Sequence, residues 1–217
     1  MADCHLKSRR GDYMTLNEFD NTYRDKYDVV CGCDEAGRGP LAGDVFAAAV
    51  VFDKDTVIEG INDSKKLTAK KREELFDVIV EKALDFSIQC ATVEEIEKFN
   101  ILNCAMLAMK RAVESMKIKP DVCLIDGNKT PELECDAIAV VKGDAQSQAI
   151  AAASILAKVA RDRYMLEMAK KFPEWQFEKH KGYGTKLHYQ MIDKYGESPI
   201  HRPSFLKKYY AKLAEQP

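Results

Sequence analysis

Three short apolar segments of this chain each run into an acidic residue. They are 29–33 followed by Asp34 and Glu35, 121–125 followed by Asp126, and 136–141 followed by a turn that contains Asp144. A short apolar run closed by turn residues is typical of a buried strand. Carboxylates are costly to desolvate and contribute nothing to a core. The pattern therefore predicts a sheet whose strand ends bring acids together at one site, as in open α/β folds.

A glycine-rich turn follows the first two acids directly. Ala36 leads into Gly37, Arg38 and Gly39, and Pro40 closes the turn. Glycines let backbone amides come close to an anion, and a guanidinium can hold a phosphate through two parallel hydrogen bonds. Acids suited to a cation and an arginine suited to a phosphate therefore lie side by side in the sequence.

The remaining segments alternate between strand and helix patterns. The short connection between the first strand and the apolar segment 44–52 predicts an antiparallel pair. A further strand is expected over 85–91, and a short helix or arm within 16–27. Thr92 and Glu95 have the spacing of a capping box, so a helical segment is expected after them, with a break near Asn100. Other helices are expected over 69–83, 101–116, 147–171, 188–195 and 205–213, and the small residues at the start of 147–171 predict close packing on the sheet. The order predicts an α/β fold with a mixed central sheet flanked by helices. We divide the chain into an N-terminal arm (1–27), an α/β core (28–172) and a helical C-terminal extension (173–217).

The composition is that of a globular protein. Hydrophobic residues make up 46% of the chain and charged residues 31%, and the longest apolar runs are too short to cross a bilayer. The first residues lack the apolar segment of a signal peptide. Cys31 and Cys33 have no second pair at zinc spacing, so we expect them in a core strand. These features predict a cytoplasmic protein with reduced thiols and no membrane association.

The net charge of −2 conceals an asymmetry along the 217 residues. Residues 142–217 hold 14 Lys and Arg against 8 Asp and Glu, whereas the rest of the chain holds 19 against 27. An acidic first part beside a basic last part fits a cation site next to a surface for a polyanion. Ordinary surface charge explains the same numbers equally well.

Four carboxylates at neighbouring strand ends would bind hard cations. Mg²⁺ and Mn²⁺ both suit oxygen ligands, and a pair of such ions can promote hydrolysis of a phosphodiester. Adjacent side chains on a strand point to opposite faces. Asp34 and Glu35 can therefore share one site only if Glu35 lies beyond the regular strand or at a bulge.

Several blocks of the chain together resemble the ribonuclease HII family, the type 2 ribonucleases H. The blocks, in the family's order between about 27 and 203, are 34–43 (DEAGRGPLAG), 63–67 (DSKKL), 125–128 (IDGN), 142–144 (KGD), 151–163 (AAASILAKVARDR) and 180–185 (HKGYGT). The resemblance implies a ribonuclease H-like fold with a helical C-terminal extension. It also implies metal-dependent cleavage of RNA in RNA–DNA hybrids and 5′ to single ribonucleotides embedded in duplex DNA, leaving 3′-OH and 5′-phosphate ends.

The resemblance also implies roles for individual residues. Asp34, Glu35, Asp126 and Asp144 match the four catalytic, metal-binding acids. Gly37, Arg38 and Gly39 match the motif that contacts the 2′-OH and the scissile phosphate region, and Tyr183 matches the tyrosine that stacks on the sugar at the ribonucleotide-to-DNA junction. The residues that lie in blocks contacting the nucleic-acid backbone are Lys65, Lys66, Ser154, Lys158 and Lys181.

Alternatives remain open at this point. Ribonuclease HIII shares the fold, although that family usually carries an extra N-terminal domain and a variant of the turn motif. A non-catalytic nucleic-acid-binding protein has no need of an acid cluster that repels phosphate. Tyr183 could be a buried aromatic, but the flanking glycines and charges favour exposure. We read His180, His188 and His201 as surface or substrate-flanking residues, and we expect a monomer.

Overall fold

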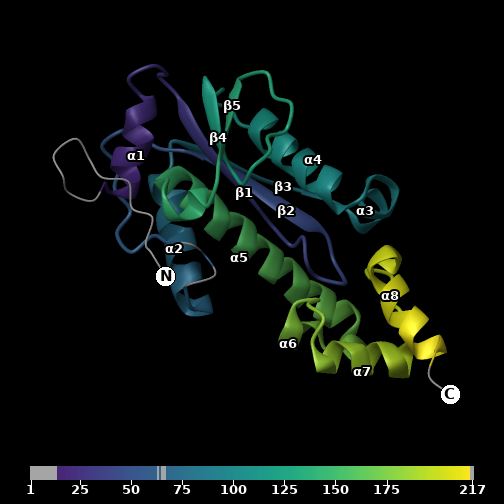
Figure 1. Ribbon diagram of the computed structural model, residues 1–217. Helices are drawn as coiled ribbons and strands as arrows, with labels where there is room; N and C mark the ends of the chain where they lie inside the picture. Colours follow the sequence, from purple (N-terminus) through teal and green to yellow (C-terminus); the bar gives the residue numbers. More distant parts are fainter. Residues whose placement is uncertain (1–13, 63, 65–66, 216–217) are drawn as a thin grey trace.

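The computed structural model describes residues 14–62, 64 and 67–215 (Figure 1). Its strands are β1 (Val30–Ala36), β2 (Val45–Val51), β3 (Asp85–Ala91), β4 (Val122–Asp126) and β5 (Asp136–Val140). Its α-helices are α1 (Leu16–Tyr23), α2 (Ala69–Lys82), α3 (Val93–Phe99), α4 (Ile101–Glu114), α5 (Gln148–Lys171), α6 (Phe177–His180), α7 (Lys186–Tyr195) and α8 (Pro203–Ala214). Two 3₁₀ turns are η1 (Gly143–Ala145) and η2 (Pro173–Trp175).

The five strands form one mixed sheet in the order β3-β2-β1-β4-β5. β2 pairs antiparallel with β1, as the short connection between these two strands predicted, and it also pairs antiparallel with β3. β1 and β4 are parallel, and so are β4 and β5. The predicted ribonuclease H-like α/β fold is thus confirmed, with β1 at the centre of the sheet. The carboxyl ends of β1, β4 and β5 all point the same way, which is what brings their acids together.

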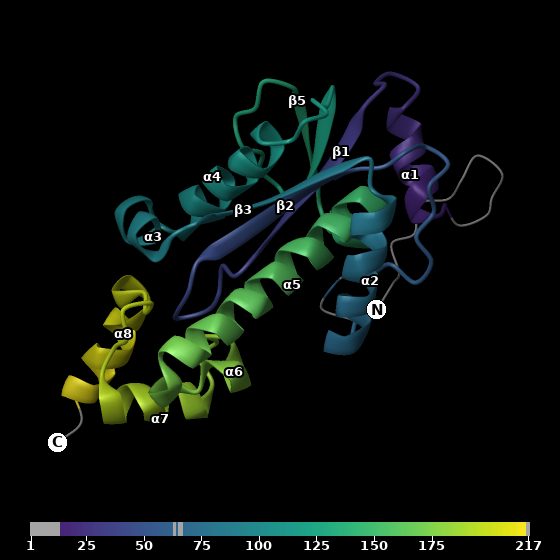
Figure 2. The same cartoon turned by 180° about the vertical axis from the view of Figure 1, so that it is seen from behind.

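Helices cover both faces of the sheet (Figures 1 and 2). Alternate residues of β2 face opposite ways: Ala47 and Ala49 pack in a core under α4, whereas Ala48 and Val50 pack in a core under α5. The alternation follows from the two-residue period of a strand. Both faces of the central strands are therefore buried, which explains their nearly continuous apolar sequence.

The long helix α5 lies against β1 with unusually close backbone contact. A Cβ added to Gly32 would lie 2.2 Å from the backbone carbon of Ala149. The alanine-rich start of α5 and the missing side chain of Gly32 make this approach possible, as the small residues predicted. The Ser147 hydroxyl accepts a hydrogen bond from the Ile150 amide at 3.1 Å and caps the helix. The beginning of α5 is thus held beside the acid-bearing strand.

Two predicted helices in the middle of the chain are separated by a single residue. Asn100 has a φ of 67° and is both the last cap of α3 and the first cap of α4. Its side chain accepts hydrogen bonds from the amides of Leu102 and Asn103. At the start of α3, Thr92 and Glu95 form the capping box that the sequence pattern indicated.

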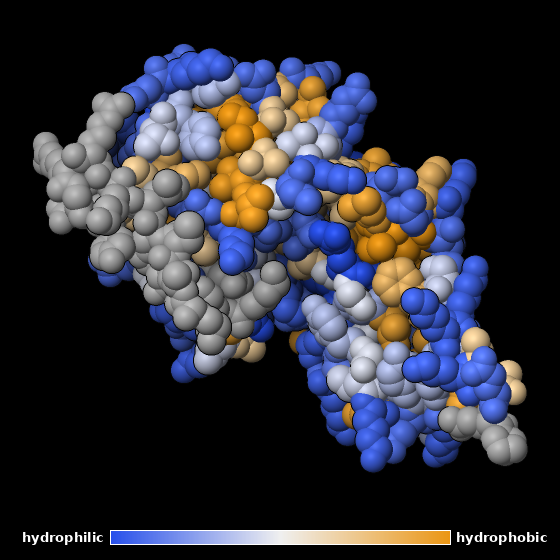
Figure 3. All heavy atoms as spheres, viewed as in Figure 1, coloured by the Kyte–Doolittle hydropathy of each residue, from blue (hydrophilic) through white to orange (hydrophobic). Residues whose placement is uncertain are grey.

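The C-terminal helices pack around the far end of α5. Residues of α5, η2 and α6 share a small apolar core that includes Met165 and Phe177. Another small core joins Leu41 to α7 and α8. Figure 3 shows these helices as a lobe on the lower right of a largely hydrophilic surface, with apolar patches between the lobe and the body. Among the described residues, no helix is both long enough and apolar enough to cross a membrane.

Candidate active site

Three of the four predicted acids converge at the carboxyl ends of the strands. Asp34 lies near the end of β1, Asp126 is the last residue of β4, and Asp144 lies in η1 just after β5. Each offers a carboxylate oxygen, and these three oxygens lie within 4.8 Å of one another. Asp34 and Asp144 are buried, and Asp126 is partly exposed. The arrangement is an acid cluster with one side open to solvent.

The turn after β5 places its acid by local geometry. Lys142 adopts a left-handed conformation with a φ of 57°, which turns the chain sharply into η1. The Gly143 amide then donates a hydrogen bond to Asp126 Oδ1 at 2.7 Å. A Cβ on Gly143 would lie 2.5 Å from the Ile150 side chain, so this close approach also requires glycine. The two acids from β4 and η1 are thereby tied together.

Burial and like charges make the cluster unfavourable when it is fully ionised. Burial raises the pKa of Asp34 well above its usual value, and the carboxylates of Glu35 and Asp126 raise it further. The Ser154 hydroxyl and the Glu35 amide oppose this by hydrogen bonding to the charged form. Oxygen donors, burial and mutual repulsion together fit a divalent cation, whose charge would stabilise all three carboxylates.

Glu35 is placed differently from the other three acids. It still lies within β1, and its carboxylate accepts a hydrogen bond from the Arg38 guanidinium at 3.0 Å. Within the described part of the chain, Glu35 is not in the group of oxygens within 4.8 Å. Its charge nevertheless contributes to the raised pKa of Asp34. Glu35 therefore borders the cluster and links it to the glycine turn.

The turn after β1 is held from inside by a buried arginine. Arg202 is completely buried, and its guanidinium donates hydrogen bonds to the carbonyls of Gly37, Pro40 and Gly43, each at 2.8 Å. A longer bond of 3.3 Å reaches the Arg38 carbonyl. Burial lowers the pKa of Arg202 to about 9, so the group still carries its charge at neutral pH. The backbone around Arg38 is thus fixed while its side chain stays exposed.

A second buried arginine joins this turn to the segment around Tyr183. Arg161 of α5 donates to the carbonyls of Ala42 at 3.0 Å and Lys181 at 3.1 Å. The Leu41 amide donates to the Gly182 carbonyl at 2.8 Å, so the two segments also bond directly. Gly37 has a φ of 105°, and a Cβ there would lie 2.2 Å from Arg161 Nε. The close packing therefore depends on glycine at both turns.

Tyr183 is exposed, as its flanking glycines predicted. Its side chain is 41% exposed, and its ring centre lies 5.7 Å from both Lys158 Nζ and the Arg161 guanidinium carbon. Gly39, by contrast, has open space around it, because an added Cβ would have no neighbour within 4 Å. The exposed aromatic ring and the open glycine turn thus lie on two segments that are hydrogen-bonded to each other, although the sequence separates them widely.

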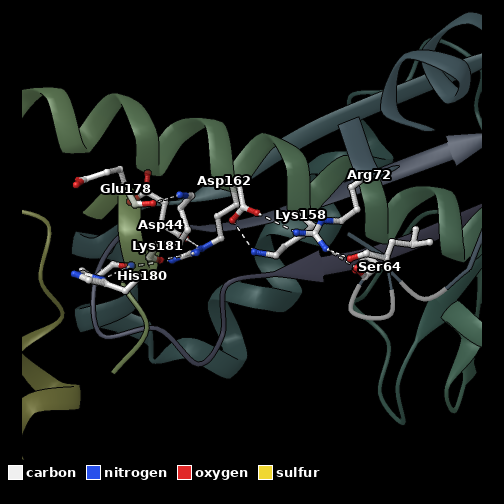
Figure 4. Close-up of polar contacts among 12 residues, drawn as sticks. Asp44, Ser64, Arg72, Lys158, Asp162, Glu178, His180 and Lys181 are labelled. Atoms are coloured by element: carbon white, nitrogen blue, oxygen red, sulfur yellow. Dashed lines mark hydrogen bonds and ion pairs between the residues drawn. The ribbon is translucent and has the colours of Figure 1, made fainter. Parts of the chain in front are cut away.

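The predicted backbone-contacting residues fall into distinct settings (Figure 4). Lys158 is half-buried and bonds Asp162 at 2.6 Å, and Lys181 bonds the Glu178 carbonyl. Ser154 is buried, and its hydroxyl lies 2.8 Å from that of Ser64. Asp162 also pairs with Arg72 of α2. Lys65 and Lys66 lie outside the described residues.

The three histidines were expected to be surface or substrate-flanking residues, and the surface alternative was wrong. His180, His188 and His201 are at most 6% exposed and pack edge-on or tilted around the Phe177 ring. Their spacing follows no helical or strand period, because they come from the end of α6, from α7 and from the loop before α8. Only the tertiary packing of the C-terminal lobe brings them together.

The sequence also gave no sign of the two buried arginines. An arginine on a long helix and another before a proline are ordinary surface residues by pattern. Their function is to satisfy the carbonyls of two irregular segments, and such segments have no periodicity that could reveal their partners. The sole hint is that Arg161 occurs in a helix face otherwise made of small and apolar residues.

Comparison with known proteins identifies the family. The model of the ribonuclease HII family matches residues 31–208. The curated ribonuclease HII of Caldicellulosiruptor bescii is 52% identical over 201 residues, which cover 89% of this chain and 98% of that protein. The chain belongs to the ribonuclease HII family. Membership makes it a ribonuclease H enzyme and favours HII over the HIII alternative.

Solved structures agree with this assignment. The ribonuclease H2 from Pyrococcus horikoshii OT3 superposes with a TM-score of 0.71 at 28% identity, covering 87% of this chain and all of that one. Bst-RNase HIII in complex with Mn²⁺ superposes with a TM-score of 0.67 at 17% identity, covering 87% of this chain and 71% of that one. The second likeness shows the shared fold alone. The acid cluster and the glycine turn described above are thus features of a protein of the ribonuclease HII family.

Proposed function

We propose that this ribonuclease HII hydrolyses the RNA strand of RNA–DNA hybrids and cuts 5′ to single ribonucleotides embedded in duplex DNA. The observation that carries the proposal is the acid cluster of Asp34, Asp126 and Asp144 beside an open glycine turn. Such a cluster repels a phosphate unless a cation is bound. Its position next to a turn that can receive a nucleic-acid backbone therefore supports cation-dependent phosphodiester chemistry.

Asp34, Asp126 and Asp144 would hold the divalent cations, Mg²⁺ or Mn²⁺, with Glu35 as the fourth acid at the border. When bound, two such cations activate a water for attack and stabilise the leaving oxygen of the phosphodiester. The protein's part is to hold the carboxylates in place through the strand ends and the Gly143–Asp126 hydrogen bond. Glu35 would contribute its carboxylate from the border of the site, and Arg38 would exchange its bond with Glu35 for one with a phosphate.

The substrate would be read at its 2′-OH, which is what distinguishes RNA from DNA. The backbone of Gly37, Arg38 and Gly39 would contact the 2′-OH, and the open space around the Cβ position of Gly39 supports this role. Tyr183 would stack on the sugar at the ribonucleotide-to-DNA junction, and its exposed ring supports this role. The remaining backbone contacts would come from Lys65, Lys66, Ser154, Lys158 and Lys181. Because Ser154 is buried, it would act from beneath the surface, through Asp34.

The proposal extends to the organisation of the chain. Residues 28–172 would form the catalytic domain, and residues 173–217 a substrate-binding extension that supplies Tyr183. The arm of residues 1–27 has no proposed chemistry. The enzyme would act as a cytoplasmic monomer, and its contacts with the nucleic-acid backbone would weaken as salt increases.

Cleavage of defined duplexes tests the proposal. One duplex carries a single ribonucleotide, a second is an RNA–DNA hybrid, and a third is all DNA. With Mg²⁺ or Mn²⁺, we expect cuts in the first two and none in the third, and EDTA should abolish both. Binding of all three duplexes without any metal-dependent cut would instead show a non-catalytic nucleic-acid-binding protein.

A further inference from the structure

A chain of hydrogen bonds runs through the buried histidines of the C-terminal lobe. The Ser198 amide donates to His201 Nδ1 at 2.7 Å, and the Ser198 hydroxyl lies 2.8 Å from the same nitrogen. His201 Nε2 lies 2.9 Å from His188 Nε2. His188 Nδ1 lies 3.0 Å from the Tyr183 carbonyl oxygen. The chain therefore begins at a loop amide and ends on the backbone of the exposed tyrosine.

The donors along this chain determine every tautomer. A backbone amide can only donate, so His201 Nδ1 must be an acceptor and the proton of neutral His201 lies on Nε2. That proton is donated to His188 Nε2, which must then be unprotonated. The proton of His188 consequently lies on Nδ1, where it can be donated to the Tyr183 carbonyl.

The third histidine is oriented in the same way. The Gly182 amide donates to His180 Nδ1 at 3.2 Å, so His180 Nε2 carries the proton and donates to the Trp175 carbonyl at 2.9 Å. Its ring stacks on that of His188 with the centres 4.1 Å apart. The two residues on either side of Lys181 are therefore anchored from below, and Tyr183 follows directly.

We propose that His188 is a positioning residue for the reaction, which fixes the backbone of Tyr183 through a tautomer imposed by His201 and Ser198. The inference rests on the proposed role of Tyr183 at the junction. It assigns to the histidines the task of holding the backbone of Tyr183 beside Gly182, whose carbonyl accepts a hydrogen bond from the Leu41 amide just after the glycine turn.

The electrostatics of the lobe support three neutral rings. Burial and the neighbouring histidines lower the pKa of His188 to about 3, and burial lowers that of His201 to about 4. A proton added to either ring would place two donors face to face, at the His188–His201 contact or at the Ser198 amide. The neutral state is thus required by the same geometry that directs His188 toward Tyr183.

The Tyr183 carbonyl has one further partner. The Thr185 amide donates to it at 2.8 Å, so the carbonyl uses both of its acceptor sites. Thr185 is the N-cap of α7, and its hydroxyl accepts a hydrogen bond from the His188 amide at 3.2 Å, so both donors to the carbonyl belong to the start of this helix. Of these two bonds, the one from the His188 side chain continues through His201 to Ser198 in the buried part of the lobe.

Two matched substitutions at one position test the positioning role. In His188→Asn the amide nitrogen takes the place of Nδ1 and keeps the donor toward Tyr183, whereas His188→Leu removes it. We expect His188→Leu to lower kcat/KM on the single-ribonucleotide duplex about 10- to 100-fold, the range for a displaced positioning contact. His188→Asn should stay within about threefold of the wild type.

Combination with Tyr183→Ala separates positioning from folding. If His188 acts through Tyr183, adding His188→Leu to Tyr183→Ala should cost less than about twofold more. A multiplicative loss in the double variant would overturn the inference and show a general structural role. If Tyr183→Ala alone cleaves like the wild type, the proposed role of Tyr183 fails and the inference fails with it, whereas metal-dependent cleavage still stands.

The tautomers of the three histidines can also be measured directly in the wild-type protein. Nitrogen-15 resonances of the histidine rings report which nitrogen carries the proton. We expect the Nδ1–H form for His188 and the Nε2–H form for His180 and His201. In His201→Leu the His188 ring loses its imposed tautomer, while His201→Gln restores a donor near Nε2. An Nε2–H form of His188 in the wild type would overturn the inference.

Discussion

The acid cluster and the framework of buried arginines and histidines solve opposite problems with polar groups. The three clustered carboxylates are like-charged, and burial raises the pKa of Asp34, to which the charges of Glu35 and Asp126 add. Arg161 and Arg202 are also buried charges, but their guanidinium groups are satisfied by backbone carbonyls. The histidines are neutral and bonded at both ring nitrogens. One region stays unfavourable until a cation binds, while the other is complete in the protein alone.

We therefore expect the acid cluster to serve activity and the framework to serve stability. Replacing one acid of the cluster by a neutral residue relieves repulsion, so the variant should be as stable as the wild type or more stable. Removing a group from the framework leaves buried polar atoms unpaired, which costs stability. The predictions below test this contrast in order of decreasing effect.

The largest effect is expected from Asp34→Asn. Loss of a cation ligand should lower the cleavage rate by at least about 100-fold, since even outer contacts to metal ligands are worth about 10- to 100-fold. Substrate binding should be kept or tightened, and the metal-free protein should melt at a higher temperature. The control is Asp77→Asn on the exposed side of α2. Cleavage by Asp34→Asn at a near-wild-type rate would show that the acid cluster is not the site of the reaction.

Arg202→Met should have the largest effect on stability. It leaves the carbonyls of Gly37, Pro40 and Gly43 without their donor, and each unsatisfied buried carbonyl costs about 1–3 kcal/mol. We expect the free energy of unfolding to fall by about 3–5 kcal/mol in urea titrations. The matched variant Arg163→Met removes an exposed ion pair with Glu73 and a contact with the Phe76 ring, and it should cost less than about 1 kcal/mol. Equal losses in the two variants would contradict the contrast.

Gly37 and Gly39 lie two residues apart, but only Gly37 packs against the buried framework, whereas Gly39 has open space around it. Gly37→Ala places a Cβ against Arg161 at positive φ and should cost about 1–3 kcal/mol of stability together with activity. Gly39→Ala meets open space and should leave stability within about 0.5 kcal/mol while lowering cleavage. Melting curves and single-ribonucleotide cleavage measure the two effects. A stable, fully active Gly37→Ala would show that the turn is looser than described.

The smallest effect is a pH dependence of stability. The pKa of His188 and of His201 lies below that of the unfolded chain, so the unfolded state binds more protons and stability falls as pH decreases from 6.5 toward 3. Buried Asp20 acts oppositely: its pKa is raised to about 6, so its cost grows as pH rises from 3.8 to 6. Replacing both histidines (His188→Asn with His201→Gln) should flatten the first dependence in thermal melts. Asp20→Asn should make the loss of stability at low pH steeper. If the dependence of melting temperature on pH were unchanged in both variants, these groups would not be its cause.

Much of the fold could be predicted from local pattern. The apolar segments ending in acids indicated β1, β4 and β5, the capping box of Thr92 and Glu95 indicated α3, and the helix expected over 147–171 begins within a residue of α5. The acid cluster was predictable for the same reason, since parallel strands carry their carboxyl ends to one edge. Glu35 shows the limit, because strand alternation warned that it would not simply join Asp34.

The sequence alone was enough to identify the apolar strands, the acids at their ends, the glycine turn and the resemblance to the ribonuclease HII family. Periodicity and local turn chemistry act over a few residues, so they can be seen in the sequence. Only the tertiary structure decided that Arg161 and Arg202 lie beneath that turn, and that three histidines lie beneath Tyr183. The physical reason is that an irregular segment leaves carbonyls unpaired within itself. Their partners come from wherever the packed chain brings a donor, and no local pattern encodes that distance.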